Sequence, residues 1–111
     1  MKNTKQIGDY GEDIACDFLK KSYGYQIIDR NWKNKYCEID IIAEKNKVIY
    51  FVEVKYRKTA EYGDGFEAIH HNKLNKLKFA AENWVYTNGW EHDYQILIAS
   101  VSPDGVEISE I

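Results

Sequence analysis

Apolar, β-branched residues dominate two short runs in the middle of the chain. Residues 39–43 and 48–54 form these runs, and the polar segment 44–47 between them contains Asn46, a residue suited to tight turns. Two such runs on either side of a short polar break predict a β-hairpin. Residues 48–52 are apolar on both faces, which is typical of a central strand that is covered on both sides.

Helical and strand patterns flank this hairpin. Apolar residues recur at helical spacing over residues 5–23, and again from residue 71 or 72 to residue 87. They predict two amphipathic helices, the first ended by Gly24 and the second by Asn88-Gly89. The first three strands should form a meander. Further strands are predicted at residues 25–30, 94–101 and 106–108, with connections at residues 31–36 and 58–65.

The acidic residues of the hairpin fall on one predicted face. Side chains alternate along a strand, so Glu38 and Asp40 should point the same way. We expect Ala43 to pair with Val48 across the turn. In that register Glu53 lies opposite Glu38 and diagonal to Asp40, so three acids crowd together. The opposite face of the first strand is purely apolar and consists of Ile39, Ile41 and Ala43.

This crowding requires a cation, because carboxylates directly opposite each other destabilise a sheet. Lys55 follows Glu53 on the same face of the second strand. Three carboxylates that face a single ammonium suit a hard divalent cation, since Mg²⁺ takes oxygen ligands. The arrangement therefore predicts a metal site. The alternative is a solvated sheet face with a Glu53–Lys55 pair.

The first predicted helix offers a further acid. Glu12 lies at the margin of the apolar stripe and could reach a site at the edge of the sheet. The alternative is an ordinary acid near a helix N-terminus, stabilised by the helix macrodipole. Gly8 and Gly11 each cost about 1 kcal/mol of helix stability relative to Ala. This cost is understandable if they let the helix approach the sheet closely.

Length and composition indicate a single domain over residues 1–111. The 44% apolar and 14% aromatic content excludes a disordered chain, and no apolar run approaches the roughly 18 residues of a membrane span. The polar N-terminus lacks the apolar segment of a secretory signal, so a cytoplasmic protein with no membrane association is expected. Cys16 and Cys37 are then expected to be reduced thiols, with a Cys16–Cys37 disulfide as the alternative.

The charges are unevenly distributed along the chain. The net charge of −3 does not suggest nucleic-acid binding, but ten Lys or Arg stand against five Asp or Glu between Lys20 and Lys58. A phosphate backbone could dock on this basic middle, although scattered lysines are also typical of a solubilising surface. The same two interpretations apply to Lys73 in the second predicted helix.

Other chemistries lack their sequence motifs. His70, His71 and His92 do not have the spacing of a zinc site. The chain contains no G-x-S-x-G, no P-loop and no G-x-G-x-x-G. A hydrolase of the Ser-His-Asp type therefore has no nucleophile.

The order of a helix with Glu12, a strand with Asp40, a hairpin and then Glu53-x-Lys55 resembles the PD-(D/E)XK nuclease superfamily. More narrowly, the chain is identified as a member of the YraN family of predicted endonucleases, which are similar to archaeal Holliday-junction resolvases. Cys37 departs from the family pattern, which commonly has Gly there, and Asp93-Tyr94-Gln95 replaces the usual Arg-Phe-Asp. The matching positions are Gly8, Gly11-Glu12, Ala15, Leu19, Gly24-Tyr25, Ile28, Arg30-Asn31, Glu38-Ile39-Asp40, Ile42-Ala43, Phe51-Val52-Glu53-Val54-Lys55, Arg57, Gly65, Glu67-Ala68-Ile69 and Lys73.

The resemblance implies an α/β, restriction-endonuclease-like fold with a central mixed β-sheet flanked by α-helices. It also implies metal-dependent hydrolysis of DNA phosphodiester bonds with Mg²⁺ or Mn²⁺. Lys55 would orient the attacking water or stabilise the developing oxyanion. Glu38 would support the metal ligands or be a further ligand itself. The implied catalytic residues are Glu12, Asp40, Glu53 and Lys55. The implied metal ligands are Asp40, Glu53, the Val54 backbone carbonyl and Glu12.

The partner implied by the resemblance is DNA, including branched or damaged DNA, with RNA as an alternative. Arg57, Lys58 and Lys73 would contact the phosphate backbone. Cutting both strands would favour a homodimer. Two other functions stay open, namely a nucleic-acid-binding module that keeps the fold without cleaving, and a structural or protein-interaction domain.

Overall fold

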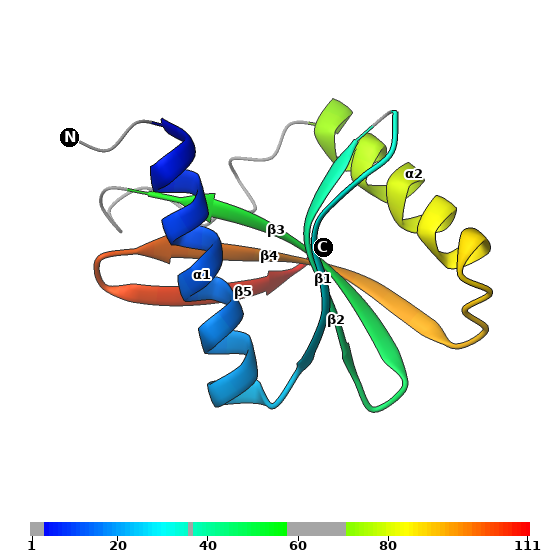
Figure 1. Cartoon of the computed structure of the whole chain (residues 1–111), viewed down its shortest axis with the longest axis horizontal. Coiled ribbons are helices and arrows are strands. Elements are labelled where there is room, and N and C mark those ends of the chain that lie inside the picture. Colours follow the sequence, from blue (N-terminus) through cyan, green and yellow to red (C-terminus); the bar gives the residue numbers. More distant parts are fainter. Residues whose placement is uncertain (1–3, 36, 58–70) are drawn as a thin grey trace.

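The computed structural model describes residues 4–35, 37–57 and 71–111. Two helices and five strands follow one another in the order shown in Figure 1. The predicted connection 58–65, which includes Lys58, lies outside the described residues. The elements are α1 Thr4–Tyr23, β1 Gln26–Lys33, β2 Glu38–Lys45, β3 Val48–Tyr56, α2 His71–Thr87, β4 Asp93–Ser102 and β5 Gly105–Glu110.

The five strands form one sheet in the order β1-β2-β3-β4-β5. Strands β1 to β3 are an antiparallel meander, as predicted. Strand β4 pairs in parallel with β3, and β5 returns antiparallel to β4. The parallel pair makes the sheet mixed, because α2 carries the chain between β3 and β4. The predicted α/β architecture is confirmed, and it is compatible with a restriction-endonuclease-like fold.

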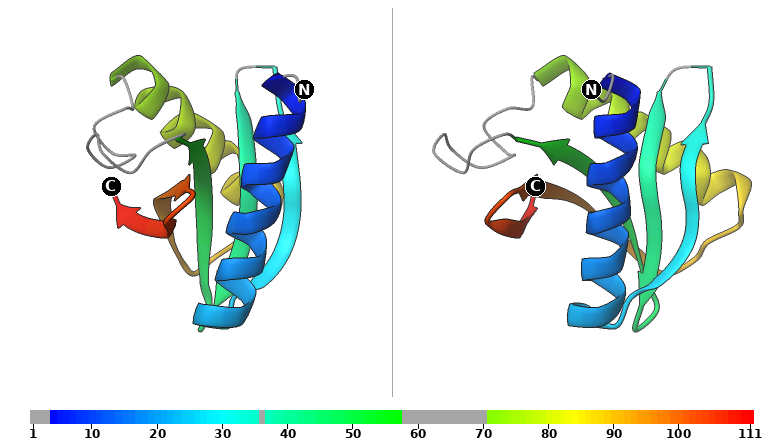
Figure 2. Two further views of the ribbon diagram at one scale, coloured as in Figure 1. Left: turned by 90° about the vertical axis from the view of Figure 1, so that its left-hand side faces the viewer. Right: turned by 60° about the vertical axis from the view of Figure 1, so that its left-hand side comes forward.

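Each face of the sheet is covered by one helix, which gives two apolar clusters (Figure 2). Strand β3 lies between them, since Val52 packs on the α1 side and Phe51 on the α2 side. This confirms the prediction of a central strand covered on both faces. The α1 cluster contains Ala15, Cys16, Leu19, Ile41, Ala43, Val52, Leu97, Ala99 and Val101. The α2 cluster contains Ile39, Ile42, Ile49, Phe51, Leu77, Ala80, Ala81, Trp84 and Ile96.

The hairpin turn is shorter than predicted. Lys45 pairs with Val48, and Asn46 and Lys47 have φ angles of 52° and 64°. Positive φ at both loop residues is the geometry of a type I′ turn, whose twist matches that of the two strands. The expected pairing of Ala43 with Val48 is therefore wrong by two residues. A shift of two keeps every side chain on its face.

Strand β1 is longer than predicted, because residues 31–33 continue it. Trp32 pairs with Ile39 of β2. The register shifts near Ile28, which is 41% exposed, and Asn31 has a φ of 55°. These two irregularities let a polar segment stay paired along the sheet edge, where the pattern of side chains alone indicated a connection.

Strands β2 and β3 separate beyond Ile41 and Val52, the last pair of their regular register, and Figure 1 shows the resulting fork. Ile39 lies beyond this point and packs on the α2 side, whereas Ile41 and Ala43 pack on the α1 side. The expected single apolar face of Ile39, Ile41 and Ala43 is thus wrong at Ile39. Regular alternation fails there because the strand leaves the sheet plane at the fork.

Two expectations about the environment of the chain can be compared with the structure. Cys16 and Cys37 are both free thiols, as expected. Cys16 belongs to α1 and is buried against the sheet, and Cys37 lies just before β2. Neither described helix is long and apolar enough to cross a bilayer.

Candidate active site

The fork between β2 and β3 holds two of the carboxylates that the sequence predicts to be catalytic. Asp40 of β2 accepts a hydrogen bond at Oδ2 from the Val54 backbone N–H, at 2.8 Å. This bond fixes the carboxylate where the strands part. Glu53 precedes Val54 on β3 and is only 3% exposed. Among the described residues it is the one charged residue that is fully buried.

The environment of Asp40 disfavours its negative charge. Burial and the charge of Glu53 raise the pKa of Asp40 to about 7, and Glu12 contributes in the same direction. The hydrogen bond from Val54 and the charge of Lys73 lower the pKa, but they do not compensate. The positive charge around Asp40 therefore does not compensate its own negative charge beside Glu53, which is the condition that favours a bound cation.

Two lysine ammonium groups lie at the same oxygen of Glu53. The Nζ atom of Lys73 is 2.8 Å from Glu53 Oε1, and that of Lys55 is 3.7 Å from it. The predicted proximity of Glu53 and Lys55 is confirmed. Burial lowers the pKa of Lys73, but the hydrogen bond and charge of Glu53 outweigh this effect and the pKa is raised.

Glu12 reaches the fork from α1. Its side chain is 12% exposed and lies 3.6 Å from the Arg30 guanidinium, which also contacts Asp13 at 2.8 Å. A Cβ atom on Gly11 would stand 3.3 Å from the Cβ atom of Tyr56, so this glycine lets α1 approach β3 closely, as predicted. Glu12 is thus held by Arg30. Its charge raises the pKa of Asp40, but Glu12, Asp40 and Glu53 do not form one compact group of carboxylates.

The donor set fits a magnesium ion held by few protein ligands. Over the ranges 4–35, 37–57 and 71–111, no three Asp, Glu, His or Cys side chains gather closely enough to hold a metal. The expected crowding of three acids into a metal-binding group is therefore absent, and in the β1–β2 register the backbone of Glu38 lies opposite that of Lys33. Asp40 and Glu53 still supply oxygen donors side by side. Mg²⁺ usually keeps several waters and takes one or two carboxylates, so this pair suffices chemically.

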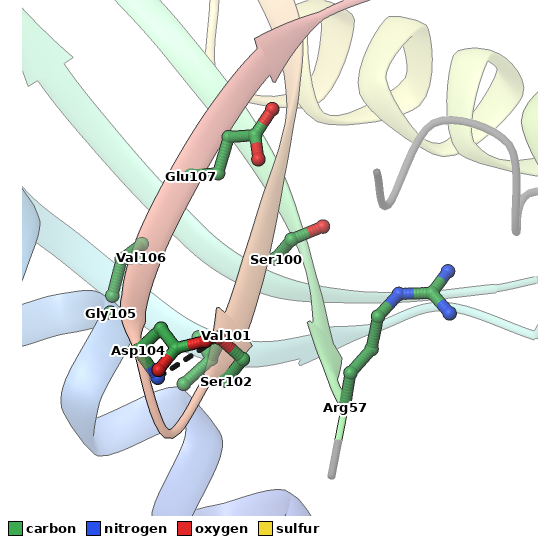
Figure 3. Close-up of a pocket in the computed structure, with 8 residues that line it drawn as sticks. All are labelled: Arg57, Ser100, Val101, Ser102, Asp104, Gly105, Val106 and Glu107. Carbon is green, nitrogen blue, oxygen red and sulfur yellow. Dashed lines mark hydrogen bonds between the residues drawn. The ribbon is translucent and has the colours of Figure 1, made fainter. Parts of the chain in front are cut away.

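An open pocket of about 220 Å³ adjoins the site on the same face of the sheet (Figure 3). Ser100 of β4 pairs with Lys55 on one side and with Glu107 of β5 on the other, which makes the pocket a continuation of the Glu53–Lys55 face. The Ser100 Oγ atom is buried and has no hydrogen-bond partner within the described part of the chain. Figure 3 shows the Arg57 guanidinium extending away from the β4–β5 hairpin.

Sequence reasoning missed two features of this region. Lys73 was expected on a solvated or phosphate-binding helix face, yet it pairs with Glu53. A signal was available, because Lys73 stands in the first turn of α2, where no acid is present and where a cation opposes the macrodipole. Ser100 carries no motif, and only the parallel pairing of β4 with β3 brings it beside Lys55.

The family of the chain follows from a comparison with protein-family models. Residues 11–102 match the model described as uncharacterised protein family UPF0102, the YraN family. The chain belongs to this family. The UPF0102 match spans Glu12, Asp40, Glu53 and Lys55, together with Lys73.

Curated UPF0102 proteins from distant bacteria resemble the chain over most of its length. A protein of Fusobacterium nucleatum is 43% identical over 109 residues, which cover 98% of this chain and 90% of that protein. A protein of Dictyoglomus turgidum is 38% identical over 93% of this chain and 89% of its own length. A protein of Rhodococcus jostii is 36% identical over 80% and 75%. The UPF0102 assignment thus rests on nearly the whole chain.

Proposed function

We propose that this UPF0102 protein hydrolyses DNA phosphodiester bonds with the help of a divalent metal ion. The observation that carries the proposal is the pair of the half-buried Asp40 and the buried Glu53 at the fork of the sheet, with two lysine ammonium groups at one oxygen of Glu53. Buried like charges are costly and persist where a site uses them. The pKa of Asp40, raised to about 7 by burial and by Glu53, supports a cation-binding site.

Asp40, Glu53 and the Val54 carbonyl, with Glu12 in support, would hold Mg²⁺ or Mn²⁺. The ion would lower the pKa of a water and neutralise charge on the scissile phosphate. The hydrogen bond from the Val54 N–H orients the Asp40 carboxylate, and Arg30 holds Glu12 at the other side of the fork. These contacts supply the rigid support that a ligand set needs.

Lys55 would be the positively charged side chain nearest to the scissile phosphate. Its ammonium group is 3.7 Å from Glu53 and its side chain is 29% exposed, so it can face both the carboxylate and a substrate. A fixed positive charge there would stabilise the oxyanion that develops during hydrolysis. Glu38, at the start of β2, would support the metal ligands and would not bind the metal itself.

The DNA backbone would pass over the face that carries Glu53, Lys55 and Arg57. The pocket beside Ser100 continues this face and offers room for a neighbouring nucleotide. Phosphate contacts by Arg57 and Lys73 would position the backbone. Cutting both strands would favour a homodimer, and a DNA substrate agrees with the cytoplasmic location expected from the sequence.

The test is cleavage of labelled linear, single-stranded and four-way-junction DNA by the wild type and by Glu53→Ala, with Mg²⁺, with Mn²⁺ and with EDTA. We expect metal-dependent cutting that Glu53→Ala abolishes. Glu44→Ala, an acid at the other end of the same hairpin, is the matched control and should cut like the wild type.

Two other outcomes would replace the proposal. Salt-sensitive DNA binding without cutting, unchanged by Lys55→Ala, would indicate a nucleic-acid-binding module that keeps the fold. Neither cutting nor salt-dependent binding would indicate a structural or protein-interaction domain. A labelled RNA panel in the same experiment would decide between DNA and RNA as substrate.

A further inference from the structure

Lys73 makes the shorter of the two described ion pairs to Glu53. Its Nζ atom is 2.8 Å from Glu53 Oε1, which is nearly 1 Å closer than the Nζ atom of Lys55 at 3.7 Å. Glu53 is 3% exposed, so its carboxylate has little water to replace a protein cation. Lys73 is thus the main counter-ion of a buried carboxylate that would otherwise be poorly compensated.

The position of Lys73 is unfavourable for its own helix. It stands in the first turn of α2, a turn that contains no acid. The N-terminal end of a helix carries partial positive charge, so a lysine there is destabilising unless another group compensates it. Glu53, from a different element, supplies that compensation. The contact between α2 and β3 therefore places a lysine where helix formation alone would not favour one.

The ammonium group of Lys73 also has a route away from the site. The Lys73 side chain is 45% exposed, whereas that of Glu53 is 4% exposed. The lysine can therefore swing into solvent while the carboxylate cannot leave the sheet. A long flexible stem makes such a movement inexpensive for lysine.

We infer that Lys73 fills the cation position of the Asp40–Glu53 site in the metal-free protein, and that a divalent metal ion binds only by displacing its ammonium group from Glu53. The inference rests on the metal-binding part of the proposed function. It makes Lys73 a competitor of the metal, in contrast to Lys55, which stays on β3 beside the carboxylate.

The first test is calorimetric titration of Mn²⁺ into the wild type and into Lys73→Met, without DNA. Loss of the competing ammonium should tighten Mn²⁺ binding about tenfold. Lys76→Met removes the same charge one turn further along α2, from an exposed position, and controls for a general electrostatic effect. It should change the dissociation constant less than about twofold. Equal effects of the two variants, or weaker binding by Lys73→Met, would overturn the inference.

A second measurement uses the wild type and does not depend on the folding of a variant. Mg²⁺ is added to protein labelled with ¹⁵N at the lysine side chains, and the Lys73 ammonium resonance is assigned from its loss in Lys73→Arg. We expect this resonance to shift as Mg²⁺ binds, because its hydrogen bond to Glu53 breaks. An unmoved Lys73 resonance at saturating Mg²⁺ would overturn the inference, as would the absence of any metal binding.

The two proposals can fail separately. Tighter Mn²⁺ binding by Lys73→Met in a protein that cuts no DNA would uphold the displacement of Lys73 and overturn the nuclease function. Metal-dependent DNA cutting with no difference between Lys73→Met and Lys76→Met in Mn²⁺ affinity would do the reverse.

Discussion

The Val54 backbone N–H donates a 2.8 Å hydrogen bond to Asp40 Oδ2 across the fork between β2 and β3. A side-chain acceptor here takes the place of a strand-to-strand contact, because the regular β2–β3 register ends at Ile41 and Val52. The bond ties an acid of one strand to the residue that follows Glu53 in the other. The opening of the sheet and the pairing of the two carboxylates are thus one structural feature.

Stability should depend on pH through Asp40. Its pKa in the folded protein is about 7, against an ordinary value of 3.8, with burial as the main cause and the charge of Glu53 next. Between these values the folded state holds a proton that the unfolded state lacks. This proton stabilises the folded state. The stabilisation is fully present below the lower pKa and is lost as the pH rises through the upper pKa.

Asp40→Asn should therefore weaken this pH dependence while keeping an acceptor for the Val54 N–H. We expect the wild type to lose stability as the pH rises from about 4 to about 7, and the variant to lose less. Urea unfolding in EDTA measures the difference. Asp17→Asn, at an exposed site paired with Lys21, serves as the control. Parallel pH profiles for the wild type and Asp40→Asn would contradict the assignment.

Glu53→Gln should lower the pKa of Asp40. The charge of Glu53 is the second cause of the raised pKa, after burial, so its removal should bring the pKa down without restoring the ordinary value. Carbon NMR of the Asp40 carboxyl over a pH titration measures the change. Glu44→Gln should leave the Asp40 pKa where it is. An unshifted value in Glu53→Gln would mean that the charge of Glu53 does not contribute to the raised pKa.

Gly11 should tolerate no branched side chain. A Cβ atom at this position already meets the Cβ atom of Tyr56 at 3.3 Å, so the extra methyls of Gly11→Val would push α1 off β3. We expect a loss of about 1–3 kcal/mol in the free energy of unfolding. In Gly11→Ala the gain in helix propensity, about 1 kcal/mol, should offset much of the free-energy cost of the close contact with Tyr56.

A double-mutant cycle locates the cause of this loss. Tyr56→Ala removes the ring that lies against Gly11 and should reduce the cost of Gly11→Val in urea unfolding. Additive effects of the two substitutions would show that the cost does not come from the Tyr56 ring, since Tyr56→Ala keeps the Cβ atom.

Lys47→Gly should stabilise the hairpin. Lys47 has a φ of 64°, a conformation in which a side chain is strained and Gly is not. The resulting Asn-Gly pair is the preferred loop of a type I′ turn. We expect a gain of about 0.5–1 kcal/mol in urea unfolding. Glu44→Gly, inside β2, should destabilise instead, and a loss for Lys47→Gly as well would argue against the type I′ geometry.

Local patterns sufficed to predict both helices and the central hairpin. Gly24, with a φ of 71°, ends α1 as predicted, and Asn46 takes the turn. The register of the β2–β3 hairpin could not be predicted from local patterns. Glu44 and Lys45 are polar, and yet they remain paired with β3 at the end of the hairpin. Polarity distinguishes solvated positions from buried ones, not strand from loop.

The contacts that join distant segments at the candidate site could not be predicted from the sequence. Asp40, Glu53 and Lys55 were predicted from one hairpin, where strand alternation places them. The Lys73–Glu53 pair depends on how α2 packs over the sheet, and the Ser100–Lys55 pairing depends on the parallel register of β4. Neither has a local signature of its own, because the first joins β3 to the crossover helix α2 and the second joins the two strands on either side of that crossover.

Calorimetric titration of Mg²⁺ into the wild type, Asp40→Ala and Glu53→Ala tests most directly whether this carboxylate pair is a metal site. The pairing of the half-buried Asp40 with the buried Glu53 predicts Mg²⁺ uptake by the wild type and none by either variant, while both variants remain folded by circular dichroism. Titration curves that are the same in all three proteins would contradict the assignment of Asp40 and Glu53 as the metal ligands.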